Sequence, residues 1–247
     1  MASEAILRDE DRPGLLARIA GVAWLVAIGT GLFAELYVRP ATIVHGDAAA
    51  TAARIAALQP LFRLGIAADL LGIVASLVFT LLLYPLLRPA GRNASMAAAG
   101  FGLAGCAVAG ANLVNFFAPL ILVDLSSAGS PAAVDPWVLV FLRLYSVGYN
   151  LSIAFFAVQV AILGWLILRS TFLPAFLGIL FLVEGGCNLA HSLLVILVPV
   201  IPPRLDSLLL LPGLFAEGGM TLWLLIAGVN VRAWHAQRRQ GLASAPA

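Results

Sequence analysis

Three glutamates in this chain lie within or at the edge of long apolar stretches. Glu35 and Glu217 both end the phrase Gly-Leu-Phe-Ala-Glu, and Glu184 and Glu217 are both followed by Gly-Gly. A charged side chain near the centre of a bilayer costs roughly 2.5–3.5 kcal/mol on insertion scales unless it is paired or faces a cavity. Glu184 and Glu217 are therefore candidates for ligand binding or proton relay. Glu35 lies close to the expected membrane interface, so we predict a structural role for it.

Other polar residues share helix faces at spacings that bring side chains to one side. Glu184 and His191 are seven residues apart, as are Arg143 and Asn150, so each pair lies about two turns apart on one face. Acidic, basic and amide groups in this pattern favour a polar pocket in the outer half of a helical bundle. The predicted ligand-binding residues are Asp69, Arg143, Asn150, Glu184, His191 and Glu217.

Two other interpretations of these residues stay open. Polar side chains often bridge membrane helices for about 0.6 kcal/mol, and a buried pair such as Arg143 with Asp69 can be purely structural. A membrane enzyme is the second alternative, because Glu184, His191 and Glu217 can in principle supply three zinc ligands for a hydrolase. The chain contains neither His-Glu-x-x-His nor Gly-x-Ser-x-Gly. We therefore predict no metal site, identify no cofactor, and leave enzymatic activity open.

The composition is that of an integral membrane protein. Of 247 residues, 62% are hydrophobic and 11% are charged, and the mean hydropathy is +1.03. Fourteen arginines and no lysine against twelve acids leave a net charge of +2, and no basic patch with interleaved aromatics indicates nucleic-acid binding. Cys106 and Cys187 lack metal-type spacing, so we predict two free thiols.

Six apolar runs are long enough to cross about 30 Å of hydrocarbon as helices. They predict an all-α, six-helix membrane bundle in one domain, 1–247, with spans near 15–38, 64–87, 96–123, 137–168, 173–198 and 207–231. A short helix is predicted near 47–59 in the first outer loop, capped by Asp47 and closed by Pro60. Breakers are expected between the spans at Arg39-Pro40, Arg88-Pro89, Ser130-Pro131, Asp135-Pro136, Pro174 and Ile201-Pro202-Pro203.

Arginines in the flanks predict the orientation, because cytoplasmic loops carry the excess of positive charge. With both termini inside, nine arginines are cytoplasmic, namely Arg8, Arg12, Arg18, Arg88, Arg92, Arg169, Arg232, Arg238 and Arg239. Four are outside, namely Arg39, Arg54, Arg63 and Arg204. We therefore predict a multi-pass protein of the inner (plasma) membrane with both termini in the cytoplasm.

Several longer phrases are distributed over most of the chain. They are GDAAATAARI at 46–55, FRLGIAADL at 62–70, LYPLL at 83–87, YSVGYN at 145–150, LRSTFLP at 168–174 and LWLL at 222–225. Together they resemble the bacterial multi-pass proteins of domain-of-unknown-function family 4386. The resemblance implies a bacterial integral membrane protein and carries no activity or catalytic residue to transfer.

The chain also departs from that pattern. Tyr145, Gln159 and His191 stand where similar proteins show His, His and Asp, so a histidine-rich metal centre would be incomplete here. The positions that match the pattern are Arg63, Asp69, Asn150 and Glu217.

The hypothesis from sequence is a membrane protein that binds or moves a small polar or amphiphilic molecule, with a lipid among the candidate ligands. Asp69 and Glu217 would be the anionic contacts and Arg143 the cationic one. A structural or accessory role is the remaining alternative, and the partners expected are the lipid bilayer and, as an open question, further copies of the chain.

Overall fold

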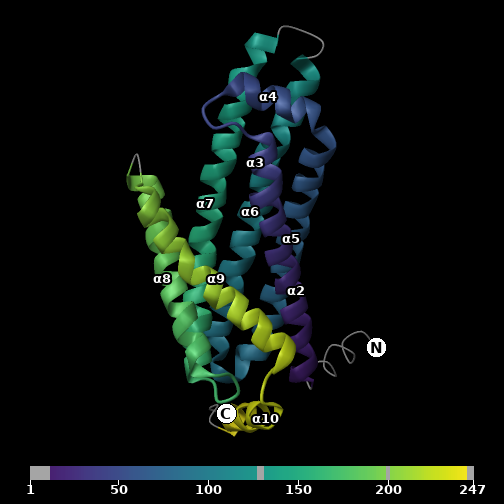
Figure 1. Ribbon diagram of the computed structural model, residues 1–247. Coiled ribbons are helices and arrows are strands. Elements are labelled where there is room, and N and C mark those ends of the chain that lie inside the picture. Colours follow the sequence, from purple (N-terminus) through teal and green to yellow (C-terminus); the bar gives the residue numbers. More distant parts are fainter. Residues whose placement is uncertain (1–11, 127–130, 199–200, 244–247) are drawn as a thin grey trace. The chain divides into compact units, whose positions relative to one another are not determined.

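The computed structural model describes residues 12–126, 131–198 and 201–243, and within these residues every regular element is a helix (Figure 1). The elements in chain order are α2 (Pro13–Phe33), η1 (Ala34–Val38), α3 (Arg39–Thr42), α4 (Ala48–Ala57), α5 (Gln59–Leu87), η2 (Arg88–Ala90), α6 (Arg92–Ser126), α7 (Pro131–Arg169), α8 (Ala175–Leu197), α9 (Pro203–Ile226) and α10 (Val231–Ala243).

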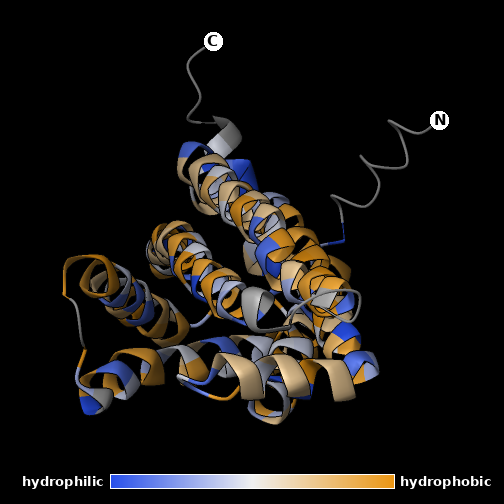
Figure 2. Ribbon diagram, turned by 90° about the horizontal axis from the view of Figure 1, so that it is seen from above, coloured by the Kyte–Doolittle hydropathy of each residue, from blue (hydrophilic) through white to orange (hydrophobic). Residues whose placement is uncertain are grey.

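Six helical segments are long and apolar enough to cross a membrane, which confirms the predicted number of spans. They are Pro13–Thr42, Gln59–Ala90, Arg92–Leu125, Asp135–Arg169, Ala175–Leu197 and Arg204–Ile226. Hydrophobic residues line these helices along their length, as Figure 2 shows in orange. The predicted orientation of the termini stays a prediction.

The chain forms two compact units, each with its own apolar core. Unit 1 comprises Met1–Leu25, Ser76–Gly105 and Ile153–Ala247, and unit 2 comprises Val26–Ala75 and Cys106–Ser152. The core of unit 1 includes Leu177, Phe181 and Met220, and that of unit 2 includes Phe62 and Phe116.

Glycines let α7 and α8 approach closely in unit 1. A Cβ built on Gly178 would lie 2.8 Å from the carbonyl oxygen of Gly164, and one on Gly185 would lie 2.8 Å from the carbonyl oxygen of Ala157. Only residues without a side chain permit such backbone approach between membrane helices. The next helix, α9, packs against α8 as an antiparallel neighbour (Figure 1).

Two predicted proline breakers do not interrupt helices, so the predictions at Arg39-Pro40 and Asp135-Pro136 were wrong. Pro40 follows a π-helical turn in which the Arg39 N–H donates to the Ala34 carbonyl, and this wider turn accommodates a residue without an N–H. Pro136 is the sixth residue of α7, past the first turn, so its missing N–H removes one intrahelical hydrogen bond while the helix continues through it. The breaker at Ser130-Pro131 falls partly outside the described residues.

Local signals set most other helix boundaries as predicted. Pro174 and Pro202 precede α8 and α9 directly. Asp47 caps α4 by accepting from the Ala50 N–H at 2.9 Å, as expected. Pro60 does not close that helix, because α4 ends at Ala57 and Pro60 lies in the first turn of α5.

The last span ends earlier than predicted, and an unpredicted helix follows it. Gly228 adopts a left-handed φ of +65° directly after α9, which stops the helix at Ile226 rather than 231. Asn230 then caps α10, its Oδ1 accepting from the Ala233 N–H at 3.1 Å. Figure 1 shows α10 lying across the open end of the α8–α9 hairpin, where α8 begins and α9 ends.

Candidate functional site

The side chain of Glu184 is the most unusual polar group in unit 1. It is fully buried, with 0% exposure, and within the described residues neither carboxyl oxygen has a hydrogen-bond partner. The residue faces α9, where a Cβ built on Gly213 would lie 3.6 Å from Glu184 Oε1. This is an ordinary van der Waals distance, so the carboxyl group lies next to α9 with room for about one methyl group between it and the Gly213 backbone.

A second carboxyl group, that of Glu217, lies beside Glu184. It is one helical turn after Gly213, is partly exposed, and is close enough to Glu184 for a hydrogen bond when one of the two carries a proton. No described arginine or histidine forms an ion pair with either group. Burying an unpaired carboxylate is very costly, so this pair requires a proton or a cation.

A further polar contact joins the same two helices. His191 Nε2 lies 2.8 Å from Asp206 Oδ1; the imidazole is buried and the carboxylate is half exposed. His191 is two turns after Glu184 on α8, and Asp206 is three turns before Glu217 on α9. The α8–α9 hairpin therefore carries polar contacts at two levels along its length.

The three residues considered as zinc ligands are Glu184, His191 and Glu217, and His191 lies two helical turns away from Glu184. Within the parts of the chain that the structure describes, no three His, Cys, Asp or Glu side chains come together at metal-binding distances. His191 is occupied by Asp206, so Glu184, His191 and Glu217 do not form the three-ligand set that a zinc-dependent hydrolase needs.

In unit 2, Asp69 pairs with Arg39 and not with Arg143. Arg39 Nη2 lies 3.0 Å from Asp69 Oδ2, and Arg39 also donates to the Tyr145 hydroxyl at 2.7 Å. The same hydroxyl donates to Asp69 at 3.0 Å, while Arg39 Nη1 lies 3.0 Å from Glu35. The charge of Asp69 is thus balanced inside the unit.

Aromatic rings complete the surroundings of Arg39. Its guanidinium carbon lies 5.2 Å from the centroid of the Phe116 ring and 5.4 Å from that of Tyr145. These cation–π contacts hold an arginine that would otherwise extend toward water. Glu35, which is largely exposed, forms an ion pair with Arg39, and the structural role predicted for it stays a prediction.

Arg143 lies away from this network. It is exposed and forms no ion pair with the described residues. Tyr145 faces Arg39 and Asp69, and a step of two residues along a helix turns a side chain to nearly the opposite side. The prediction that Arg143 contacts the ligand beside Asp69 therefore has no support in this geometry.

The predicted Asn150 and two further asparagines of unit 2, Asn112 and Asn115, form hydrogen bonds with nearby groups. Asn150 Nδ2 donates to the Ser146 carbonyl on its own helix at 3.0 Å. Asn112 Nδ2 donates across to the Tyr145 carbonyl at 2.8 Å, and Asn115 donates to Asn112 at 3.0 Å. Asn112 thus has the bridging role that polar groups commonly play between membrane helices, and Asn115 supports it from the same helix.

Comparison with known families matches a family model over most of the chain. The model, described as a domain of unknown function (DUF4386), covers residues 19–228. The chain belongs to this family. No curated protein and no solved structure matches it. The matched region of this DUF4386 member contains all the predicted site residues, and α10 follows it.

The structure distributes the six predicted residues over both units. Glu184, His191 and Glu217 belong to unit 1, and the other three belong to unit 2. Only Glu184 and Glu217 come together as a candidate site. Sequence reasoning missed Arg39 and Asp206, although each stands at a predicted helix end where a side chain can reach its neighbour.

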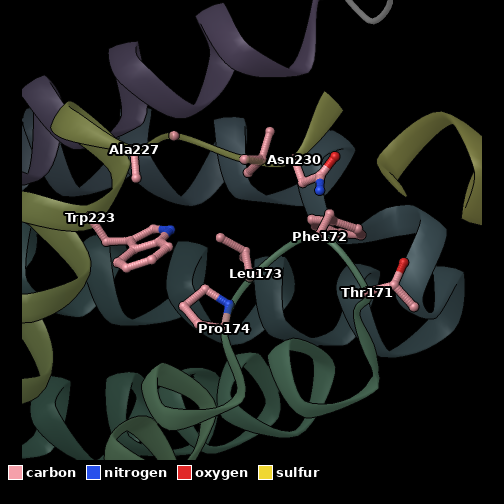
Figure 3. A pocket seen from close by; sticks show the side chains of 9 residues that line it. Thr171, Phe172, Leu173, Pro174, Trp223, Ala227 and Asn230 are labelled. Atoms are coloured by element: carbon pink, nitrogen blue, oxygen red, sulfur yellow. The ribbon is translucent and has the colours of Figure 1, made fainter. Parts of the chain in front are cut away.

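A separate hollow of about 480 Å³ lies between the α7–α8 loop and the α9–α10 turn of this DUF4386 member. Trp223, Leu173 and Pro174 line it, and Figure 3 shows their side chains close together. Its lining has no charged residue and includes neither Glu184 nor Glu217. This hollow is therefore not the predicted polar pocket.

Proposed function

We propose that this protein binds an amphiphilic cation at the Glu184–Glu217 pair and exchanges it for a proton, as a step in carrying that molecule within the membrane. The observation that carries the proposal is the fully buried Glu184 carboxyl, which among the described residues has no cation beside it and no possible hydrogen-bond donor other than a protonated Glu217. Two neighbouring carboxyl groups are stabilised by one shared proton or by a bound positive charge.

The surroundings of Glu217 favour a ligand with an apolar part. Leu214, one turn before it on the same side of α9, is 62% exposed, and Phe215 is 60% exposed. A cationic head group at the carboxyl pair can therefore be combined with an apolar body along α9. This explains why a site without a large enclosed cavity can still take an amphiphile.

Asp69 and His191, the other predicted site residues that can carry charge inside the bundle, already have partners, which leaves the Glu184–Glu217 pair as the cation site. Asp69 is already paired with Arg39, and His191 with Asp206. The family resemblance supports a location in a bacterial inner (plasma) membrane, and the arginine distribution supports cytoplasmic termini; we include both in the proposal.

Carbodiimide labelling tests the proton on this pair. Dicyclohexylcarbodiimide adds to protonated carboxyl groups in apolar surroundings and forms a stable acylurea, which peptide mass spectrometry locates. In native membranes we expect the adduct on Glu184 or Glu217, and we expect tetraphenylphosphonium to reduce it. Glu184→Gln should lose the adduct at that position.

The matched control is Glu35→Gln, because Glu35 is an exposed glutamate of unit 2 that pairs with Arg39. Labelling of the pair should be unchanged in this variant. A folded wild-type protein without an adduct on either Glu184 or Glu217 would contradict the proton, and labelling that tetraphenylphosphonium leaves unchanged would contradict the cation site.

A further inference from the structure

The C-terminal helix α10 presents a basic face that the proposed function does not use. Arg232, His235 and Arg239 recur at steps of three and four, so they lie in one row along the helix. Together with Arg238 they line a hollow of about 650 Å³. Arg232 and Arg239 are exposed.

The opposite face of α10 packs against other helices of unit 1. Trp234 is buried, and its Nε1–H donates to the Leu86 carbonyl at 2.8 Å. Gln237 Oε1 accepts from the Thr171 N–H at 2.9 Å, and its Nε2 donates to the Arg169 carbonyl at 3.0 Å. These contacts hold α10 across the ends of α5 and α7, so the basic row is pre-organised.

Charge at this end of unit 1 is strongly positive. Arg88, Arg92 and Arg169 stand exposed at the ends of the helices next to α10. The carboxylates in the described part of unit 1 are Glu184, Asp206 and Glu217, all within α8 and α9, and none lines the hollow. The hollow is therefore complementary to an anion.

We infer that this hollow binds the phosphate of an anionic phospholipid head group from the surrounding bilayer. Arginine guanidinium groups bind phosphate through paired N–H donors, and a basic helix at a membrane surface attracts anionic lipids. A head group is favoured over a soluble phosphate because α10 begins only five residues after the membrane span that ends at Ile226. At that distance from the hydrocarbon, phospholipid phosphates are the most concentrated anions.

Lipid titration of the detergent-purified full chain tests this site. Phosphatidylglycerol and phosphatidylcholine with identical short chains are titrated while native mass spectrometry counts bound lipid. We expect wild type to bind phosphatidylglycerol at least about 25-fold more tightly than phosphatidylcholine. Arg232→Gln with Arg239→Gln should weaken that binding by about 25-fold, about fivefold for each arginine, and leave phosphatidylcholine unchanged.

The charge-matched control is Arg63→Gln with Arg143→Gln, which removes two exposed arginines of unit 2 and should leave the lipid preference intact. Should the α10 variant fail to fold, the wild-type protein still tests the inference, because raising ammonium acetate, a salt compatible with native mass spectrometry, from about 0.1 to about 0.5 M must weaken phosphatidylglycerol binding. Equal affinity for the two lipids, or equal losses in both double variants, would overturn it. Inorganic phosphate that binds as tightly as the lipid would reassign the hollow to a soluble anion and overturn the lipid assignment.

Discussion

Arg39 Nη2 lies 3.0 Å from Asp69 Oδ2, although the two residues are thirty positions apart and belong to different helices. Their side chains are only 17% and 11% exposed. The shared hydroxyl of Tyr145 closes the arrangement, since it accepts from the arginine and donates to the carboxylate. Two intramembrane charges thus neutralise each other within unit 2, which indicates a structural rather than a ligand-binding role for Asp69.

Replacing Arg39 with Gln should strongly destabilise the protein. The substitution leaves Asp69 buried without its cation, and breaking a buried pair in this way costs about 3–5 kcal/mol. Thermal unfolding in detergent measures the loss. Arg143→Gln is the control, because this arginine is exposed and makes no ion pair with the described residues, so its melting temperature should match that of wild type.

The double variant Arg39→Gln with Asp69→Asn tests whether the two residues stabilise the protein as a pair. Removing both charges should recover much of the stability that the single variant loses, because no uncompensated charge remains. Losses that simply add would show that the two residues act independently and would contradict the pairing.

The membrane-spanning helices could be predicted from sequence because hydropathy alone determines them. The prolines were harder to interpret: Pro174 and Pro202 do precede helices, whereas Pro40 follows a π-helical turn. No sequence signal distinguishes that turn in advance. Helix α10 was not predicted because it is polar. Its one clear signal was Asn230, a good N-cap residue two positions after Gly228.

The candidate site was predicted only in part, because the sequence does not show in which direction every side chain points. Glu184 and Glu217 stand on neighbouring antiparallel helices, so their proximity follows from a hairpin. The partner of Asp69 could not be predicted in this way. Arg39 was assigned to the outer flank, and only the π-helical turn before it and the rings of Phe116 and Tyr145 explain why it points inward.

Glu184→Gln should fold at least as well as wild type. Glutamine has the shape of a protonated glutamate and carries no charge, and its amide group can donate to Glu217 in place of the shared proton. We expect the free energy of unfolding to stay within about 1 kcal/mol of wild type or to rise. Chemical unfolding in detergent measures it. A large loss of stability would mean that the acidic pair supports the fold and would contradict its assignment as a site.

Asn112→Ala should lower the melting temperature, because Asn112 donates to the Tyr145 carbonyl and accepts from Asn115. A bond between two membrane helices, such as the one from Asn112 on α6 to Tyr145 on α7, contributes about 0.6 kcal/mol. Asn93→Ala, at an exposed position near the start of α6, is the control and should have little effect. Unchanged melting of the Asn112 variant would show that this bridge does not stabilise unit 2.

Adjacent glycines on α8 should respond to alanine in opposite directions. At Gly185 a new Cβ would lie 2.8 Å from the Ala157 carbonyl oxygen and from the Ala161 nitrogen, both backbone atoms that cannot move aside separately. At Gly186 a Cβ would meet nothing within 4 Å. We expect Gly185→Ala to destabilise by about 1–3 kcal/mol through overpacking, and Gly186→Ala to stabilise by about 0.4–1 kcal/mol through helix propensity. Thermal unfolding of the two variants decides the matter: equal effects would mean that α7 and α8 do not approach as closely as their glycines allow.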